Sequence, residues 1–138
     1  MSNLEQRVKQ KVKEWVSSAD DDLAYAELGL DHSAESMNPQ IAFHAQQCAE
    51  KYLKAYLVYR MVKFPYTHDI SVLLRLCGET AGWVAEINGA KKLTDYATTL
   101  RYPGEENVVT RQEAIEAVGI AIHTSEVVRK ALVIDGLI

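Results

Sequence analysis

The segment from Phe43 to Leu57 constrains the fold of this chain more than any other part of the sequence. It contains no glycine or proline, and its apolar residues cover most of the circumference of a helix. A helix that is apolar on most sides belongs in the middle of a bundle, where other helices cover it. We expect it to begin at Asn38-Pro39, with Asn38 as cap, and to continue to about Lys63, just before Pro65.

The two ends of the sequence also carry helical patterns. From Leu4 to Leu30, apolar residues recur at spacings of three and four, which predicts a long first helix with one buried face. Near the other end, Thr110 and Glu113 have the spacing of a capping box, in which each side chain binds the backbone of the other residue. This pair predicts a last helix that runs to about Asp135.

The middle of the chain predicts shorter helices. Asp69 is placed to cap a short third helix, and a further helix through Trp83 is expected to break at Asn88-Gly89 and to end near Leu100. The whole chain has 138 residues, a length that suits one domain with its own core. We therefore expect residues 1–138 to form a single all-α domain, an antiparallel four- to five-helix up-and-down bundle.

Composition narrows the environment and the partners of the protein. The net charge of −4 argues against bulk binding to nucleic acid, which needs a basic surface. Cys48 and Cys77 lie apart in apolar patterns, as buried free thiols do in a reducing compartment. No apolar run is long enough to span a membrane, and the first residues lack the order of a signal peptide. We therefore expect a cytoplasmic protein that does not enter membranes.

Several common chemistries have no support in the sequence. The glycines are scattered rather than gathered into a phosphate-binding loop, and no cysteines or histidines stand at zinc-binding spacing. The run Asp20-Asp21-Asp22 cannot chelate one ion, because consecutive residues diverge by about 100° on a helix. His123 falls opposite the apolar face of the last helix, so we expect it to be exposed. The sequence therefore predicts neither a metal nor a cofactor.

Polar residues interrupt the apolar surface of the central helix. They are His44, Gln47 and Lys51, which share one face. Asp22, on the buried face of the first helix, is the expected counter-charge for Lys51 or His44. Glu50 and Lys54 should lie to one side and be more easily solvated. Either the stripe is a satisfied network that fixes the register of the helices, or it forms a site for a ligand or partner.

Two further clusters leave both a structural and a functional interpretation open. Thr67-His68-Asp69 is either the start of a helix or a polar group near the end of the bundle. In Arg101-Tyr102-Pro103-Gly104, the guanidinium of Arg101 either binds a phosphate or carboxylate or satisfies the carbonyls at a helix end.

Three segments in order resemble a HEPN domain, a family named for nucleotide binding in higher eukaryotes and prokaryotes. The resemblance extends from about Val12 to Pro103, and its second segment is the most specific. The segments are Trp15 with Asp22-Leu23; Phe43-His44-Ala45-Gln46-Gln47 with Ala49-Glu50-Lys51 and Leu53-Lys54-Ala55; and Thr67-His68-Asp69 followed by Tyr96 and Arg101-Tyr102-Pro103.

The resemblance implies an antiparallel helical bundle that is commonly a homodimer. It also implies genomic pairing with a minimal nucleotidyltransferase, often as a toxin–antitoxin module. Many HEPN proteins are metal-independent ribonucleases with an arginine followed, after four to six residues, by a histidine. No arginine of this chain has a histidine at that distance; the nearest pair, Arg60 and His68, is separated by seven residues and straddles Pro65. The ribonuclease pair therefore does not carry over.

Three functions remain open from the sequence. The first is a non-catalytic HEPN protein that binds a nucleotide, a minimal nucleotidyltransferase, or both. The second is a ribonuclease with an altered site that uses Arg101 with His68 or His44, and the third is a structural bundle whose polar stripe sets register. We assign no catalytic residue. The candidate binding or network residues are Asp22, His44, Gln47, Lys51, His68, Asp69, Tyr96 and Arg101.

Overall fold

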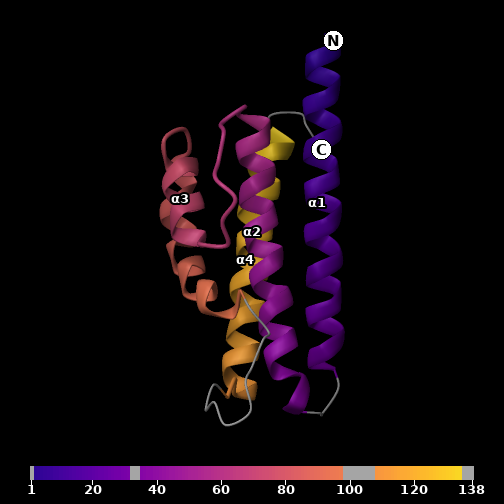
Figure 1. Ribbon diagram of the computed structural model, residues 1–138, viewed down its shortest axis with the longest axis vertical. Coiled ribbons are helices and arrows are strands. Elements are labelled where there is room, and N and C mark those ends of the chain that lie inside the picture. The colour runs from indigo at the N-terminus through magenta and orange to yellow at the C-terminus, as the bar shows by residue number, and fades with distance from the viewer. Residues whose placement is uncertain (1, 32–34, 98–107, 135–138) are drawn as a thin grey trace.

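The computed structural model describes residues 2–31, 35–97 and 108–134 (Figure 1). These residues form four α-helices and two 3₁₀ segments, with no strand among them. In chain order the elements are α1 (Asn3–Leu30), the 3₁₀ segment η1 (Glu35–Met37), α2 (Asn38–Tyr59), α3 (Ile70–Gly78), the 3₁₀ segment η2 (Gly82–Tyr96) and α4 (Arg111–Ile134). The predicted all-α bundle is confirmed.

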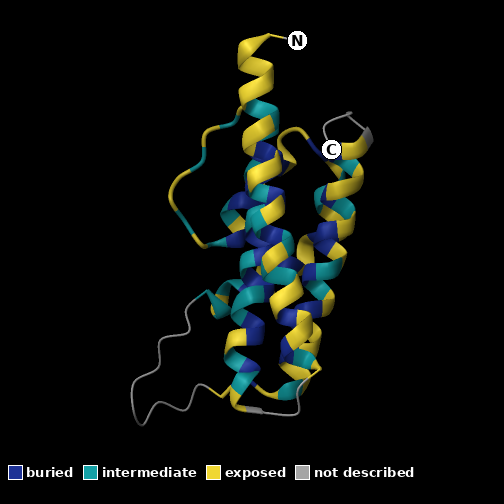
Figure 2. Ribbon diagram, turned by 90° about the vertical axis from the view of Figure 1, so that its right-hand side faces the viewer, coloured by how far each residue is buried: buried dark blue, intermediate teal, exposed yellow. Residues whose placement is uncertain are grey.

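Helix α2 is the centre of the bundle, as its apolar surface predicts. Fourteen of its 22 residues are buried. Figure 1 shows α1 running antiparallel to α2 on one side, α4 behind it, and α3 with η2 on the side away from α1. In Figure 2 the buried residues gather on the facing sides of the helices and the exposed ones on the outer sides. The buried residues of α2 include the polar Asn38, Gln46, Glu50 and Lys54.

The connection between α2 and α3, residues 60–69, is an extended segment that returns along α2 (Figure 1). The carbonyl oxygen of His68 accepts a hydrogen bond from Gln46, near the start of α2. Beyond α3, Thr80 is hydrogen-bonded to Tyr56, near the end of α2. Helix α3 therefore runs in the same direction as α2. The segment 60–69, which we call the returning segment, lies beside α2 and contacts it at Gln46.

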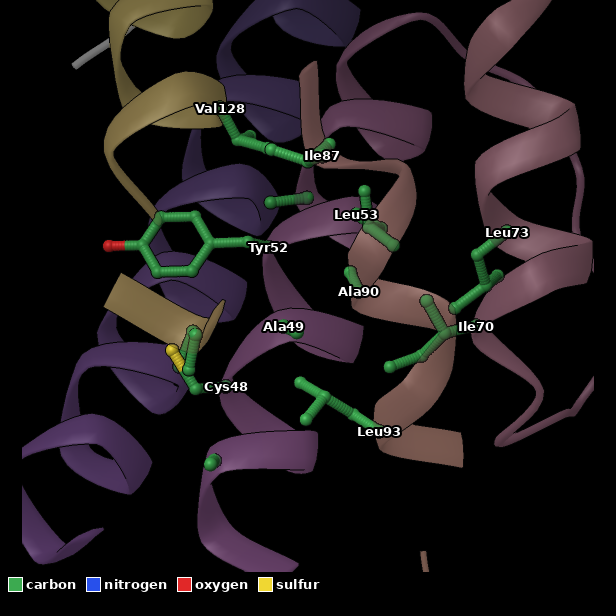
Figure 3. Close-up of a cluster of buried hydrophobic side chains, with 14 of the residues drawn as sticks. Cys48, Ala49, Tyr52, Leu53, Ile70, Leu73, Ile87, Ala90, Leu93 and Val128 are labelled. Atoms are coloured by element: carbon green, nitrogen blue, oxygen red, sulfur yellow. The ribbon is translucent and has the colours of Figure 1, made fainter. Parts of the chain in front are cut away.

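One part of the core lies where α2, α3, η2 and α4 meet (Figure 3), and α1 adds Val12, Val16, Ala19 and Ala26 to the same cluster. Tyr52 and Leu53 of α2 are fully buried. Around them pack side chains from three other elements: Ile70, Leu73, Ile87, Leu93 and Val128.

Both cysteines are buried free thiols, as the sequence predicts. Burial raises the pKa of Cys48, and it raises the pKa of Cys77 to about 12. Neither thiol is therefore a reactive thiolate at neutral pH.

The predicted caps are correct for two helices and wrong for one. The carboxylate of Asp69 accepts from the backbone N–H of Ser71 at 2.9 Å. Thr110 and Glu113 form both halves of the capping box, at 3.0 and 3.1 Å. Asn38, however, is the first residue of α2 rather than its cap, because the turn η1 leads directly into the helix and places Met37 at the capping position.

Helix α2 ends at Tyr59, earlier than the predicted Lys63. Met61 has a φ of 57°, the left-handed conformation that ends a helix. The N–H of Val62 binds the carbonyl of Leu57 at 2.9 Å, and the N–H of Met61 binds that of Val58 at 3.0 Å. These two bonds make a Schellman motif. The sequence did not signal it, because glycine usually holds this position.

Replacing Met61 with glycine should stabilise the protein by about 1 kcal/mol, because glycine adopts positive φ without steric cost. The side chain is 62% exposed, so little packing is lost. Urea unfolding monitored by circular dichroism measures the change. Met61→Ala is the control and should show no gain, since alanine keeps the Cβ atom; equal stabilisation by both variants would contradict the explanation.

The remaining differences from the predicted helices are small. The break within η2 falls at Ile87 (φ −120°, ψ 23°), one residue before the predicted Asn88-Gly89. The predicted helix ends at Leu100 and Asp135 lie outside the described residues. In the part of the chain that the structure describes, no helix is both long and apolar enough to cross a membrane.

Candidate functional site

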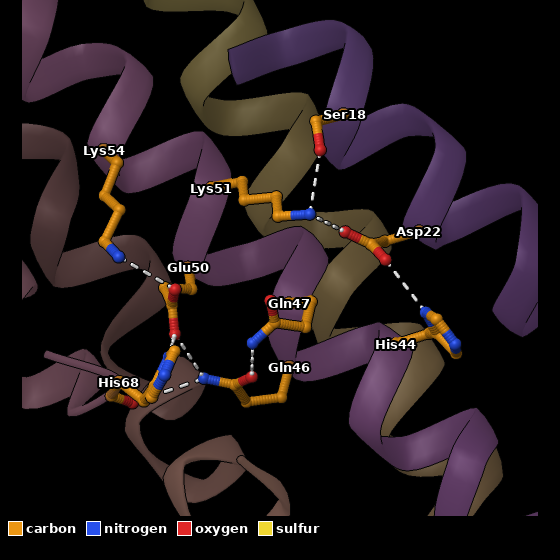
Figure 4. A network of polar contacts seen from close by, with 9 residues as sticks. All are labelled: Ser18, Asp22, His44, Gln46, Gln47, Glu50, Lys51, Lys54 and His68. Atoms are coloured by element: carbon orange, nitrogen blue, oxygen red, sulfur yellow. Dashed lines mark hydrogen bonds and ion pairs between the residues drawn. The ribbon is translucent and has the colours of Figure 1, made fainter. Parts of the chain in front are cut away.

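The first polar cluster on α2 is built around the carboxylate of Asp22, on α1 (Figure 4). Its Oδ1 lies 2.8 Å from Nδ1 of His44, and its Oδ2 accepts from Nζ of Lys51 at 2.7 Å. Lys51 also donates to Oγ of Ser18 at 2.8 Å. Asp22 therefore binds both of the residues for which the sequence proposed it as counter-charge.

The second cluster is built around Glu50, and the prediction that Glu50 and Lys54 are solvated is wrong. Glu50 is 2% exposed and Lys54 5% exposed. The carboxylate accepts from Lys54 Nζ at 2.9 Å, from Gln46 Nε2 at 2.9 Å, and lies 2.8 Å from His68 Nδ1. The returning segment 60–69 supplies His68, and it closes over these groups, which is why they are not solvated.

Aromatic rings surround the ammonium group of Lys54. It lies 5.5 Å from the centre of the Trp15 ring on α1 and 5.9 Å from that of Phe64 in the returning segment. Such contacts are favourable for a desolvated cation. They connect α1, α2 and the returning segment at one buried charge.

The two clusters have the same composition, and we name them the α1 triad (Lys51, Asp22, His44) and the loop triad (Lys54, Glu50, His68). In each triad one carboxylate oxygen accepts from a lysine and the other lies against histidine Nδ1. Since an ionised carboxylate only accepts, Nδ1 donates and Nε2 is left for another partner. Each triad thus pairs one lysine with one carboxylate and leaves one imidazole nitrogen, Nε2, that the carboxylate does not bind.

An exposed tyrosine lies against each histidine. The ring centres of Tyr25 and His44 are 4.1 Å apart, and those of Tyr66 and His68 are 5.5 Å apart. Tyr25 is 51% exposed and Tyr66 is 92% exposed. We call the two triads with these tyrosines the α2 polar face. Its most exposed groups are the two phenol rings and the imidazole of His68, while Glu50 and Lys54 are buried.

Gln47 lies between the two triads in Figure 4. Its Nε2 donates to Oε1 of Gln46 at 2.7 Å, so it belongs with the loop triad rather than with Asp22. The side chains of His44, Lys51 and His68 are 24%, 21% and 44% exposed. The lysines and carboxylates of both triads are paired, and both histidine side chains are partly exposed.

Two predicted site residues, Asp69 and Tyr96, have contacts outside this face, and a third, Arg101, is not described by the structure. Hydrogen bonds from Ser71 lower the pKa of Asp69, whose carboxylate acts as a helix cap. Tyr96 donates to Glu113 at 3.4 Å, and partial burial, followed by the charge of Glu113, raises its pKa. Arg101, with the rest of Arg101-Tyr102-Pro103-Gly104, lies outside the described residues.

A third polar contact, between Tyr52, Asp20 and Arg129, was not predicted from the sequence. The hydroxyl of the fully buried Tyr52 is hydrogen-bonded to Asp20 and accepts from Nε of Arg129 at 3.1 Å; Arg129 also pairs with Asp20. Burial is the main cause of the raised pKa of Tyr52. A buried tyrosine needs a partner for its hydroxyl, and that requirement was the available signal.

Two other expectations concern metal binding and His123. Within residues 2–31, 35–97 and 108–134, no three histidine, cysteine or acidic side chains gather as a metal site would require. His123 is exposed on α4, as its position opposite the apolar face predicts, and its Nε2 lies 3.1 Å from the carbonyl oxygen of Glu86. This histidine is therefore in contact with η2.

Comparison with known proteins agrees with this architecture. The family model described as HEPN domain matches residues 12–131. TT1696 from Thermus thermophilus superposes with a TM-score of 0.69 at 25% identity, covering 87% of this chain and 97% of that protein. An archaeal HEPN homologue superposes with a TM-score of 0.68 at 23% identity, covering 88% and 97%. No curated protein matches the chain. The chain belongs to the HEPN domain family.

Proposed function

We propose that this HEPN protein is a non-catalytic binding protein. It associates with a minimal nucleotidyltransferase, in a two-gene module of toxin–antitoxin type, and its α2 polar face recognises that partner or a nucleotide. The observation that carries the proposal is the pair of triads. They hold two histidines, each beside an exposed tyrosine, and both lysines already have carboxylate partners.

The chemistry of this face suits recognition. An imidazole nitrogen donates or accepts a hydrogen bond according to its protonation, and tyrosine offers apolar surface with a polar tip. Because the carboxylates fix the histidines from below, little conformational entropy is lost on binding. The absence of the family's arginine–histidine spacing from the sequence supports a role without catalysis.

The proposal is tested by mixing the protein with the minimal nucleotidyltransferase of the neighbouring gene and, separately, with ATP and GTP. Size-exclusion chromatography and calorimetry should detect a complex with at least one of them. His44→Ala and His68→Ala should each weaken it about tenfold, the effect of losing one good hydrogen bond to a charged group. His123→Ala is the matched control and should bind as the parent does.

Absence of heat and of a complex with all three would contradict the proposal. If the two histidine variants lost stability but no binding changed, the network would set the register of the helices only. Both variants keep the lysine–carboxylate pair of their triad, so they should fold.

One observation favours a second candidate, a ribonuclease with an altered site. A histidine held by a carboxylate at Nδ1, with Nε2 free, has the arrangement of a general acid or base. In this case the purified protein should cut RNA, and Arg101→Ala, His44→Ala or His68→Ala should abolish cutting. Intact RNA after long incubation with excess protein would eliminate this candidate.

A further inference from the structure

A groove is lined by residues of α3 and η2. Figure 1 places α3 on the side of α2 away from α1. The volume of the groove is about 460 Å³, within the range of small-molecule sites. The α3 wall is one helix face, and the η2 wall spans the break at Ile87. The lining residues are Ser71, Leu74, Arg75, Gly78 and Glu79 from the α3 side, and Val84, Asn88 and Lys91 from η2.

Two cations from different elements face this groove. Arg75 comes from α3 and Lys91 from η2, and both are exposed. Within the part of the chain that the structure describes, neither makes a direct ion pair or hydrogen bond, although Arg75 is close enough to Asp69 for its charge to help lower the pKa of that carboxylate. By contrast, Lys51 and Lys54 in the two triads each have a carboxylate partner. A guanidinium and an ammonium in one groove, neither bound directly by a described carboxylate, are available to an anion.

The other end of the groove is apolar. Leu74 is 4% exposed, and Val84 lies beside Gly78. A Cβ atom added at Gly78 would meet only Cγ1 of Val84, at 4.0 Å, so the missing side chain leaves this end open. Glu79 follows Gly78 directly and repels an anion there. The groove therefore favours one orientation, with negative charge towards Arg75 and Lys91.

We propose that this groove binds a small amphipathic anion, a phosphate monoester with a short apolar body. The phosphate is held by Arg75 and Lys91, whose combined charge matches a dianion. The apolar body covers Leu74 and Val84. Asn88 supplies a polar amide beside the phosphate end.

Titration with hexyl phosphate, followed by the amide signals of the labelled protein in NMR spectra, tests the proposal. The signals of Arg75, Asn88 and Lys91 should shift in a saturable way. Arg75→Gln and Lys91→Gln should each weaken binding about tenfold, whereas Arg7→Gln, an exposed arginine on α1, should not. Unchanged signals around the groove, or equal weakening by Arg7→Gln, would overturn the proposal.

Gly78→Leu tests the apolar end, because leucine fills the space beside Val84. It should weaken hexyl phosphate binding about tenfold without unfolding α3, whose backbone at Gly78 suits any residue. Gly89→Leu is the matched control, since a Cβ there meets nothing within 4 Å and Gly89 does not line this groove. Inorganic phosphate and 1-hexanol should each bind at least about tenfold more weakly than hexyl phosphate. Equally tight binding of either, or no effect of Gly78→Leu, would overturn the proposal.

Discussion

Replacing Glu50 with alanine should destabilise the folded protein by about 3–5 kcal/mol, because it leaves the buried ammonium of Lys54 without its counter-charge. Lys54 is 5% exposed, and Glu50 is the carboxylate that binds it, at 2.9 Å. The same change removes an acceptor from His68 and Gln46. The returning segment 60–69 would lose its main polar attachment to α2.

Urea unfolding at neutral pH measures this loss. The matched control is Glu116→Ala, which removes an exposed ion pair with Lys92 at 3.7 Å and should cost less than about 1 kcal/mol. A double variant, Glu50→Leu with Lys54→Met, removes both charges and should recover much of the lost stability. If Glu50→Ala costs no more than Glu116→Ala, the loop triad does not hold the returning segment to α2.

Cys48 and Cys77 should react with iodoacetamide at least about a thousandfold more slowly in the native protein than an exposed cysteine does. Both are fully buried, and burial raises the pKa of each thiol, so that the reactive thiolate forms only when the core opens. Opening of the core of a domain costs most of its unfolding free energy, several kcal/mol. The labelling rate therefore reports the stability of the core.

Mass spectrometry of the alkylated protein over time provides the measurement. A variant carrying Ser17→Cys, at an exposed position on α1, supplies the internal reference for an accessible thiol. Glu50→Ala should speed labelling of both buried cysteines in proportion to its loss of stability. Rapid labelling of Cys48 or Cys77 in the parent protein would show that the core opens locally near that residue.

The sequence predicted the α1 triad because its geometry is set by two regular helices. His44 and Lys51 lie on one face of α2, and Asp22 lies within the apolar stripe of α1 that must contact α2. Helical periodicity alone therefore brings the three groups together. HEPN membership was likewise recognisable, because the most specific residues fall within the same helix.

The loop triad could not be predicted in the same way. Glu50 and Lys54 are buried by residues 60–69, and the path of that extended segment depends on the turn at Met61. No local sequence pattern predicts that a methionine adopts the left-handed backbone conformation. The contact of Arg129 with Tyr52 was also not predicted. It joins residues 77 positions apart on two helices, and the rotation of each helix about its axis is fixed only by packing. Regular elements were predictable, whereas contacts made through an irregular segment were not.

The concentration of both triads on α2 has a consequence for how this chain can vary in length. An inserted or deleted residue in a helix turns everything beyond it by about 100°. An insertion or deletion between His44 and Lys54 would rotate the residues on one side of it relative to those on the other. The polar groups on one side would then move away from Asp22 or from His68, while those on the other side stayed in place. Related sequences should therefore tolerate substitutions within these eleven positions far better than any gap.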